Sequence, residues 1–139
     1  MTIERTLAII KPDAFENHHV GEIIQCIEKS GLTLAGMKML RLTASQVERF
    51  YYVHNDKYFF PLLCEMMLSG PVVVMLIEGE SAISRWRQMI GPTDPAECGP
   101  ETIRGAFGES IRHNAVHGSD CPDSAAFETA FFFSESELV

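Results

Sequence analysis

The sequence predicts an α+β fold with four strands in one antiparallel sheet and helices on one face of that sheet. Short apolar or alternating runs typical of strands occur at residues 6–10, 32–42, 72–77 and 115–116. Segments with apolar residues at helical spacing lie between the first and second runs and between the third and fourth. This order is that of a βαββαβ unit, the ferredoxin-like arrangement, and we expect residues 1–139 to form a single domain.

The first part of the chain is predicted to alternate strand, helix and strand. Residues 6–10 form a continuous apolar run typical of a central strand, and Lys11-Pro12-Asp13 is predicted to be the loop that ends it. Residues 20–30 carry isoleucines at helical spacing, so they indicate an amphipathic helix that Gly31 is suited to cap. Partial alternation of apolar side chains over residues 32–42 predicts the second strand.

A helical hairpin is predicted to follow the second strand. Thr43-Ala44-Ser45-Gln46 has the form of a capping box and opens a helix that runs to about Val53. A tight connection at residues 56–58 leads to a second helix over residues 59–68, with Pro61 in its first turn. Its apolar residues fit a buried core helix, and the aromatic residues of the hairpin fit a stacking surface equally well.

The second half of the chain completes the predicted unit. Residues 72–77 are continuous and β-branched, so this strand is expected to be buried on both faces. The further expected elements are a helix at 80–90, a long loop at 91–101, a helical turn at 102–107, an edge strand into His117, a helix at about 122–133 and a short tail at 134–139. A loop as long as 91–101 inside a compact fold is often functional.

Composition limits the classes of function. A net charge of −8, from 11 basic and 19 acidic residues, argues against nucleic-acid binding, because such binding needs an extended basic face. A local phosphate site needs only a few converging Lys and Arg side chains, so it stays open. The four cysteines form no Cys-x-x-Cys motif and have no zinc spacing with the five histidines. We expect no signal peptide before the first strand, and no apolar run is long enough to cross a membrane. We therefore expect a cytoplasmic protein without a membrane partner.

Residues 112–120 form the stretch that most strongly suggests chemistry. The apolar pair 115–116 is predicted to end a strand and to deliver His117 to a Gly-Ser-Asp turn. A histidine held there beside a hydroxyl and a carboxylate can act as a base, a metal ligand or a nucleophile. The alternative is a surface histidine before an ordinary turn, and these residues alone leave all of these readings open.

Polar and cationic side chains at the ends of the predicted elements suggest a phosphate site. The glycine-rich phosphate loops and the His-Glu-x-x-His zinc motif are absent from the sequence. Guanidinium and ammonium groups can hold a phosphate chain in place of a glycine cradle. The candidates are Lys11, His54, Arg87, Thr93, Arg104 and Asn114.

Several separated motifs resemble the nucleoside diphosphate kinase family. Residues 114–120, Asn-Ala-Val-His-Gly-Ser-Asp, are similar to the family's active-site signature Asn-x-x-His-Gly-Ser-Asp. Further similar segments lie at residues 5–13, 20–23, 69–73, 91–95 and 102–105, in the family's order and with its gaps. The resemblance therefore extends along nearly the whole chain. It implies a ferredoxin-like fold and ping-pong exchange of the γ-phosphate between nucleoside triphosphates, mainly ATP, and nucleoside diphosphates.

The resemblance also implies roles for individual residues. His117 would become phosphorylated, Glu128 would bind its other ring nitrogen, and Ser119 would support that pair. The residues that would hold phosphates or ribose, or assist at the nucleophile, are Lys11, Tyr51, Arg87, Thr93, Arg104 and Asn114, with His54 and Lys57 near the β-phosphate. Those that would sandwich or line the base are Phe59, Ile111 and Leu63.

The remaining expectations concern the cofactor, the partners and two differences from the family's sequence pattern. Mg²⁺ is expected to arrive on the nucleotide's phosphates, with no metal ligands from the protein, and ATP, GTP and ADP are expected ligands. The resemblance implies a homo-oligomer built from dimers, a tetramer or a hexamer. Two positions depart from the family pattern. Lys57-Tyr58 stands where many relatives have Arg-Pro, and lysine lacks the bidentate guanidinium fork of arginine. Ala106 stands where an aspartate is common. The alternative function is a catalytically weak regulatory or binding module of the same fold.

Overall fold

Four antiparallel strands form the centre of the molecule, as the computed structural model describes it for residues 3–139. The strands are β1 (Ile3–Ile10), β2 (Thr33–Leu40), β3 (Val72–Glu80) and β4 (Val116–Gly118). Their order is β2-β3-β1-β4, so β1 and β3 are central and β4 is a short edge strand beside β1. The predicted ferredoxin-like βαββαβ fold is confirmed.

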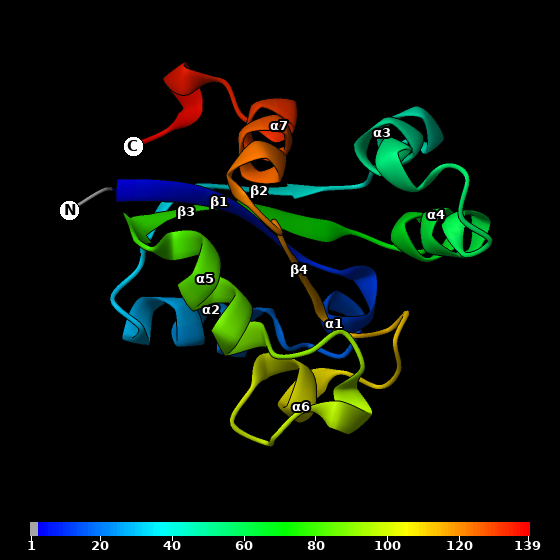
Figure 1. Ribbon diagram of the computed structural model, residues 1–139, viewed down its shortest axis with the longest axis horizontal. Coiled ribbons are helices and arrows are strands. Elements are labelled where there is room, and N and C mark those ends of the chain that lie inside the picture. The colour runs from blue at the N-terminus through cyan, green and yellow to red at the C-terminus, as the bar shows by residue number, and fades with distance from the viewer. Residues whose placement is uncertain (1–2) are drawn as a thin grey trace.

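One face of the sheet carries the two helices of that unit. They are α2 (Val20–Lys29) and α5 (Ala82–Ile90), which lie on the same side of the sheet in Figure 1. Ile23 and Ile27 of α2, and Trp86 and Ile90 of α5, are fully buried against the side chains that alternate residues of β1 and β3 send to this face. The amphipathic stripe seen in the sequence at residues 20–30 is thus the core-facing side of α2.

The opposite face of the sheet is also covered. Helix α7 (Pro122–Phe132) packs on β1, and the hairpin of α3 (Ala44–Phe50) and α4 (Phe60–Leu68) adjoins it (Figure 1). A second apolar cluster joins these helices to the side chains of Leu7 and Ile9. Helices were predicted on one face only. The βαββαβ order fixes the positions of the two helices inside that unit, but it does not determine where helices outside the unit pack.

Several local predictions are confirmed by backbone geometry. Thr43 and Gln46 form the predicted capping box at the start of α3, and Pro122 occupies the first turn of α7. Gly31 follows α2 with a φ of 88°, the left-handed conformation that a glycine takes readily after a helix. These are short-range signals, so the sequence alone was sufficient to read them.

Other boundaries differ from the predictions. Residues 11–13 were predicted as a loop, which is wrong: α1 (Pro12–Glu16) begins there, since proline suits the first turn of a helix. Residue 80, predicted as the first residue of a helix, still belongs to β3, because Glu80 pairs with Ile3 across the sheet. The remaining short elements are 3-10 helices at Tyr52–His54, Pro95–Glu97 and Glu135–Glu137, and the helix α6 (Ile103–Phe107). Between residues 3 and 139, no helix has the length and apolar character needed to cross a membrane.

Candidate active site

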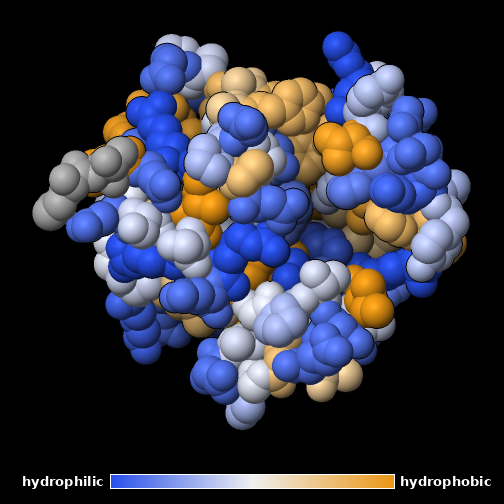
Figure 2. All heavy atoms as spheres, in the orientation of Figure 1, coloured by the Kyte–Doolittle hydropathy of each residue, from blue (hydrophilic) through white to orange (hydrophobic). Residues whose placement is uncertain are grey.

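A cleft of about 480 Å³ opens between the helical hairpin and the loops that precede β4. Figure 2 shows a hollow in this region of the surface that is lined mainly by hydrophilic residues. The predicted site residues that line the cleft are Lys11, Tyr51, His54, Phe59, Leu63, Arg87, Thr93, Arg104, Ile111, Asn114 and His117. Residues from both halves of the chain therefore converge on one hollow.

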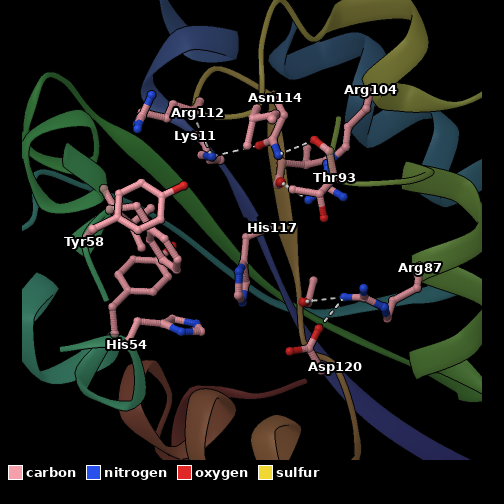
Figure 3. A pocket seen from close by; sticks show the side chains of 16 residues that line it. Lys11, His54, Tyr58, Arg87, Thr93, Arg104, Arg112, Asn114, His117 and Asp120 are labelled. Carbon is pink, nitrogen blue, oxygen red and sulfur yellow. Dashed lines mark hydrogen bonds and ion pairs between the residues drawn. The ribbon is translucent and has the colours of Figure 1, made fainter. Parts of the chain in front are cut away.

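His117 lies in the middle of this group (Figure 3). Its ring also contacts the carboxylate of Glu128, which lies outside the cleft lining. Its Nε2 is 2.7 Å from Oε1 of Glu128, and the Ser119 hydroxyl donates to the same oxygen at 2.8 Å. A carboxylate only accepts hydrogen bonds, so Nε2 carries the proton in the neutral ring. The lone pair is then on Nδ1, which gives the imidazole one defined nucleophilic nitrogen.

The backbone at His117 is held from two directions. Within β4, His117 pairs with Ile9 of β1, and the Trp86 indole N–H donates to the His117 carbonyl oxygen at 3.1 Å. Position 118 requires a glycine, because a Cβ there would lie 2.7 Å from Cδ1 of Trp86. Ser119 is fully buried and accepts a hydrogen bond from the Leu7 amide at 3.2 Å. The sheet itself thus fixes both the histidine and the hydroxyl that supports its partner.

Lys11 leaves the end of β1 and enters the cleft as an almost buried cation. Its Nζ donates to Oδ1 of Asn114 at 2.7 Å and to the Arg112 carbonyl oxygen at 3.0 Å. Burial lowers the pKa of Lys11 to about 8, with Asp13 acting in the opposite direction and Arg104 adding to the decrease. At neutral pH, below this pKa, the ammonium keeps its charge.

Arg104 is the second buried cation of the cleft. It donates to the carbonyl oxygens of Gly91 at 3.0 Å and Val116 at 2.9 Å, so it joins the 91–101 loop to β4. Burial, followed by repulsion from Arg87, lowers the pKa of Arg104 to about 10. Its Nε is buried without a partner among residues 3–139. The guanidinium therefore stays charged at neutral pH in a position already fixed by the protein.

Two further contacts define the rim beside His117. The Arg87 guanidinium pairs with Asp120 at 2.7 Å and donates to the Gly118 carbonyl oxygen at 3.2 Å. The amide of Asn114 donates to the Thr93 carbonyl oxygen at 3.0 Å, which ties the long loop to the segment before β4. These groups form a polar wall opposite the hairpin (Figure 3).

The hairpin supplies an aromatic wall. The ring of Tyr51 lies edge-on to that of His117, with centroids 6.1 Å apart, and burial raises the pKa of the Tyr51 hydroxyl. His54 and Tyr58 both contact Phe59, with ring centroids 5.6 Å apart in each pair. Phe59 from the hairpin and Ile111 from the loop before β4 both line the cleft, and apolar side chains of this kind suit a flat ligand.

Some predicted residues lie outside the cleft lining. Ser119 and Glu128 lie behind His117, where a supporting pair would be expected. Lys57 is exposed and does not line the cleft. It belongs to the turn of the hairpin, whose direction depends on how α3 and α4 pack.

Several lining residues were not singled out by the sequence. They are Tyr58, Arg112 and Asp120, together with Val116 and Gly118. Their place depends on the path of the loops, although Asp120 was visible as the last residue of the Gly-Ser-Asp turn. The pair 115–116 was predicted to end a strand, and this is wrong: Ala115 precedes β4 with a φ of 74°, and Val116 begins β4, which runs on to Gly118.

This arrangement is suited to phosphoryl transfer. The cleft lining includes the imidazole of His117, the amide of Asn114 and four cationic side chains, those of Lys11, Arg87, Arg104 and Arg112. Such groups stabilise the charge that spreads over a transferring phosphoryl group. Asp120 is the one carboxylate among the lining residues, and residues 3–139 hold no cluster of three His, Cys, Asp or Glu side chains that would bind an ion by itself.

Comparisons with known proteins agree with this geometry. The model of the family described as Nucleoside diphosphate kinase matches residues 4–138. The chain is 52% identical to the nucleoside diphosphate kinase of Chlamydia pneumoniae over 137 residues, covering 99% of this chain and 95% of that one. Among solved structures, that of the Aquifex aeolicus enzyme has a TM-score of 0.97 at 45% identity, covering 99% and 100% of the two chains. A Halobacterium salinarum enzyme solved in complex with CDP has a TM-score of 0.95 at 38% identity, covering 99% of this chain and 92% of that one.

Proposed function

The chain belongs to the nucleoside diphosphate kinase family and is a phosphotransferase of that kind, and from this premise we propose that His117 carries the transferred phosphoryl group. The observation that supports this most directly is the 2.7 Å contact between Nε2 of His117 and Glu128. Because the Glu128 carboxylate accepts this hydrogen bond, the ring proton stays on Nε2, and the lone pair of Nδ1 is free to attack. The surrounding cations fit the charge of a triphosphate.

In the first half of the reaction, Nδ1 of His117 attacks the γ-phosphorus of a nucleoside triphosphate, mainly ATP. The Nδ1–P bond forms while the bond from phosphorus to the β,γ-bridging oxygen breaks, and the nucleoside diphosphate leaves with that oxygen and its electron pair. The ring becomes positively charged as it attacks, and the Glu128 carboxylate stabilises that charge. In the second half, a terminal β-phosphate oxygen of another diphosphate attacks the same phosphorus, the Nδ1–P bond breaks, and its electron pair returns to Nδ1 of His117.

The cations have separate roles in this proposal. Lys11 and Arg104 are buried, so each has a strong field and little freedom to reorient when charge develops on the phosphoryl oxygens. Arg87 is more exposed, and its carboxylate partner Asp120 keeps it at the rim. Tyr51, His54 and Asn114 place hydrogen-bonding groups around the same path.

Mg²⁺ fits the donor set only as an ion that the nucleotide brings with it. Within residues 3–139 the protein offers the cleft a single carboxylate, Asp120, and that group is paired with Arg87. A mostly phosphate-coordinated ion needs no more than this. When bound, Mg²⁺ would neutralise part of the phosphate charge and align the phosphate chain.

Nucleoside tri- and diphosphates are the proposed ligands, with the base between Phe59 and Ile111 and beside Leu63. The side chain of Lys57 would reach the β-phosphate only if the hairpin moved, since it points outside the cleft lining. A homo-oligomer built from dimers and a cytoplasmic location are further parts of the proposal. The free thiols of all four cysteines support a reducing compartment.

Incubation with γ-labelled ATP tests the proposal. The protein should acquire a label that is stable in alkali and labile in acid, and ADP or CDP should remove it as labelled triphosphate. His117→Ala should acquire none, whereas His113→Ala, a change at an exposed neighbouring histidine, should label normally. Absence of label on the unaltered protein would refute the phosphohistidine mechanism.

A further inference from the structure

Ala115, two residues before His117, has a backbone conformation that costs energy. Its φ is 74°, in the left-handed region that alanine rarely adopts. The amide of Val116 donates to the carbonyl oxygen of Asn114 at 2.9 Å, so Ala115 is the centre of a γ-turn of the rare, positive-φ form. Strain of this kind persists only where the surroundings hold the backbone in place.

Both polar groups of the Ala115 backbone are held by the segment that follows β1. The Ala115 amide donates to Oδ2 of Asp13 at 3.0 Å, and its carbonyl oxygen accepts from the Lys11 amide at 2.9 Å. The Asp13 contact is buried, and the side chain of Asp13 is only 8% exposed. A bond from a buried N–H to a carboxylate is among the stronger hydrogen bonds in proteins.

The residues on either side of this turn belong to the cleft. Asn114 accepts from the ammonium of Lys11 at 2.7 Å, and Val116 begins the three-residue strand that carries His117. Strand β4 is too short to hold its own entry angle by pairing alone, because its register with β1 covers only residues 116–118. If the turn relaxed, Asn114 and His117 would move together.

We propose that Asp13 is a positioning residue: its carboxylate holds the Ala115 turn and thereby fixes Asn114 and His117 for phosphoryl transfer. Asp13 does not line the cleft and touches neither ring nitrogen, so its effect passes through the backbone of Ala115. The inference rests on the proposed role of His117. It concerns alignment, which affects the rate of transfer more than the binding of nucleotide.

Two substitutions at Asp13 separate the hydrogen bond from the charge. Asp13→Ala removes the acceptor and should lower the rate of His117 phosphorylation by about 10- to 100-fold, with KM for ATP changed less than about threefold. Asp13→Asn keeps an acceptor oxygen without the charge, and its rate should stay within about fivefold of the unaltered protein. Glu16→Ala is the matched control, since it removes an exposed carboxylate from the same helix α1.

A rescue experiment tests the route through Ala115. Glycine adopts a positive φ without a Cβ conflict, so Asp13→Ala/Ala115→Gly should recover about tenfold in rate over Asp13→Ala. Loss of a merely structural contact would not be repaired by removing a methyl group. All rates are single-turnover rates measured on protein shown by urea titration to be folded.

Three results would overturn the inference. One is full-rate phosphorylation in Asp13→Ala, the second is a loss in Asp13→Asn as large as that in Asp13→Ala, and the third is the absence of rescue by glycine. If Asp13→Ala does not fold, Asp13→Asn/Ala115→Gly is compared with Asp13→Ala/Ala115→Gly; a rate difference under about tenfold supports the inference and a larger one overturns it. An unaltered protein that takes no label would instead remove the proposed function, so the two failures are distinguishable.

Discussion

The two sides of the cleft are built in different ways. On the side of the sheet, Lys11, Arg104 and Asn114 are buried, and each has at least two hydrogen bonds to neighbouring groups. On the side of the hairpin, Tyr58 is 87% exposed, and its ring is nearly perpendicular to that of Phe59. One side holds its groups at defined distances, whereas the other offers flat surfaces.

This difference separates two tasks of recognition. Fixed cations and donors are selective for charge and geometry, so the sheet side suits the phosphate chain that all nucleotides share. Stacking surfaces accept any flat ring because every base has a π-face. We infer that the protein recognises the phosphates strictly and the base loosely, as an enzyme that serves many nucleosides requires.

The largest effect should come from removing a fixed cation. Arg104→Ala should lower kcat/KM by about 10³-fold, because it takes away charge stabilisation and also releases the carbonyl oxygens of Gly91 and Val116. Steady-state kinetics with ATP and ADP would measure this, and Arg41→Ala, an exposed arginine at the end of β2, is the control. Arg104→Lys should recover little, since lysine lacks the planar guanidinium fork whose two terminal nitrogens each bond one of these carbonyl oxygens. A loss of kcat/KM of less than tenfold in Arg104→Ala would mean that the sheet side does not recognise the phosphates strictly.

A smaller loss should follow when the support behind His117 is removed. Glu128→Ala should slow phosphorylation by about 10- to 100-fold while the affinity for ADP changes little, because Glu128 lies outside the cleft lining. Single-turnover labelling and calorimetric titration of ADP would separate the two quantities. Asp123→Ala, a change at an exposed carboxylate in the first turn of the same helix, should have no effect on either. A large loss of ADP affinity in Glu128→Ala would contradict this assignment.

The sequence predicted a four-stranded antiparallel sheet of the ferredoxin-like class. It also named most of the residues that line the cleft. Short-range signals such as the capping box at Thr43 and the apolar stripe on α2 depend on neighbouring residues, so they could be read directly. The roles of individually ordinary residues such as Lys11 and Arg87 came from the resemblance to a family, because spacing alone does not bring distant segments together. In these cases similarity supplied the long-range information.

What the sequence missed depends on packing. The left-handed backbone at Ala115 follows from two hydrogen bonds to residues 11–13, which lie about a hundred positions earlier in the chain. No local pattern marks an alanine for that conformation. Likewise, Arg112 and Tyr58 reach the cleft only because the loop before β4 and the hairpin turn toward it.

The pH dependence of Lys11 provides a third, milder test of the sheet side. The pKa of Lys11 in the free protein is lowered to about 8, so the ammonium loses its proton above that pH. Then kcat/KM for ATP should fall up to about tenfold per pH unit above 8. The free energy of unfolding should move in the opposite direction, rising between pH 8 and about 10.5, because in this window the unfolded chain binds more protons than the folded one.

Lys11→Met serves as the control for that profile. It should abolish the rise in the free energy of unfolding with pH, which urea titrations at several pH values would measure. Its kcat/KM for ATP should be low and should not change with pH. If kcat/KM of the unaltered protein stayed constant up to pH 9.5, the Lys11 charge would not be required on the phosphates.

The smallest effect should come from the hairpin side. Phe59→Ala should weaken the binding of ADP and CDP by a similar factor, about five- to tenfold, because one of two stacking surfaces is lost whatever the base is. Lys57→Ala, two residues earlier on the same turn, should cost less than about threefold, since its side chain is exposed and lies outside the cleft lining. Fluorescence or calorimetric titration of both nucleotides would compare the two variants. A loss confined to one base would show that the hairpin discriminates between bases, and an effect of Lys57→Ala larger than that of Phe59→Ala would show that the hairpin closes onto the phosphates when nucleotide binds.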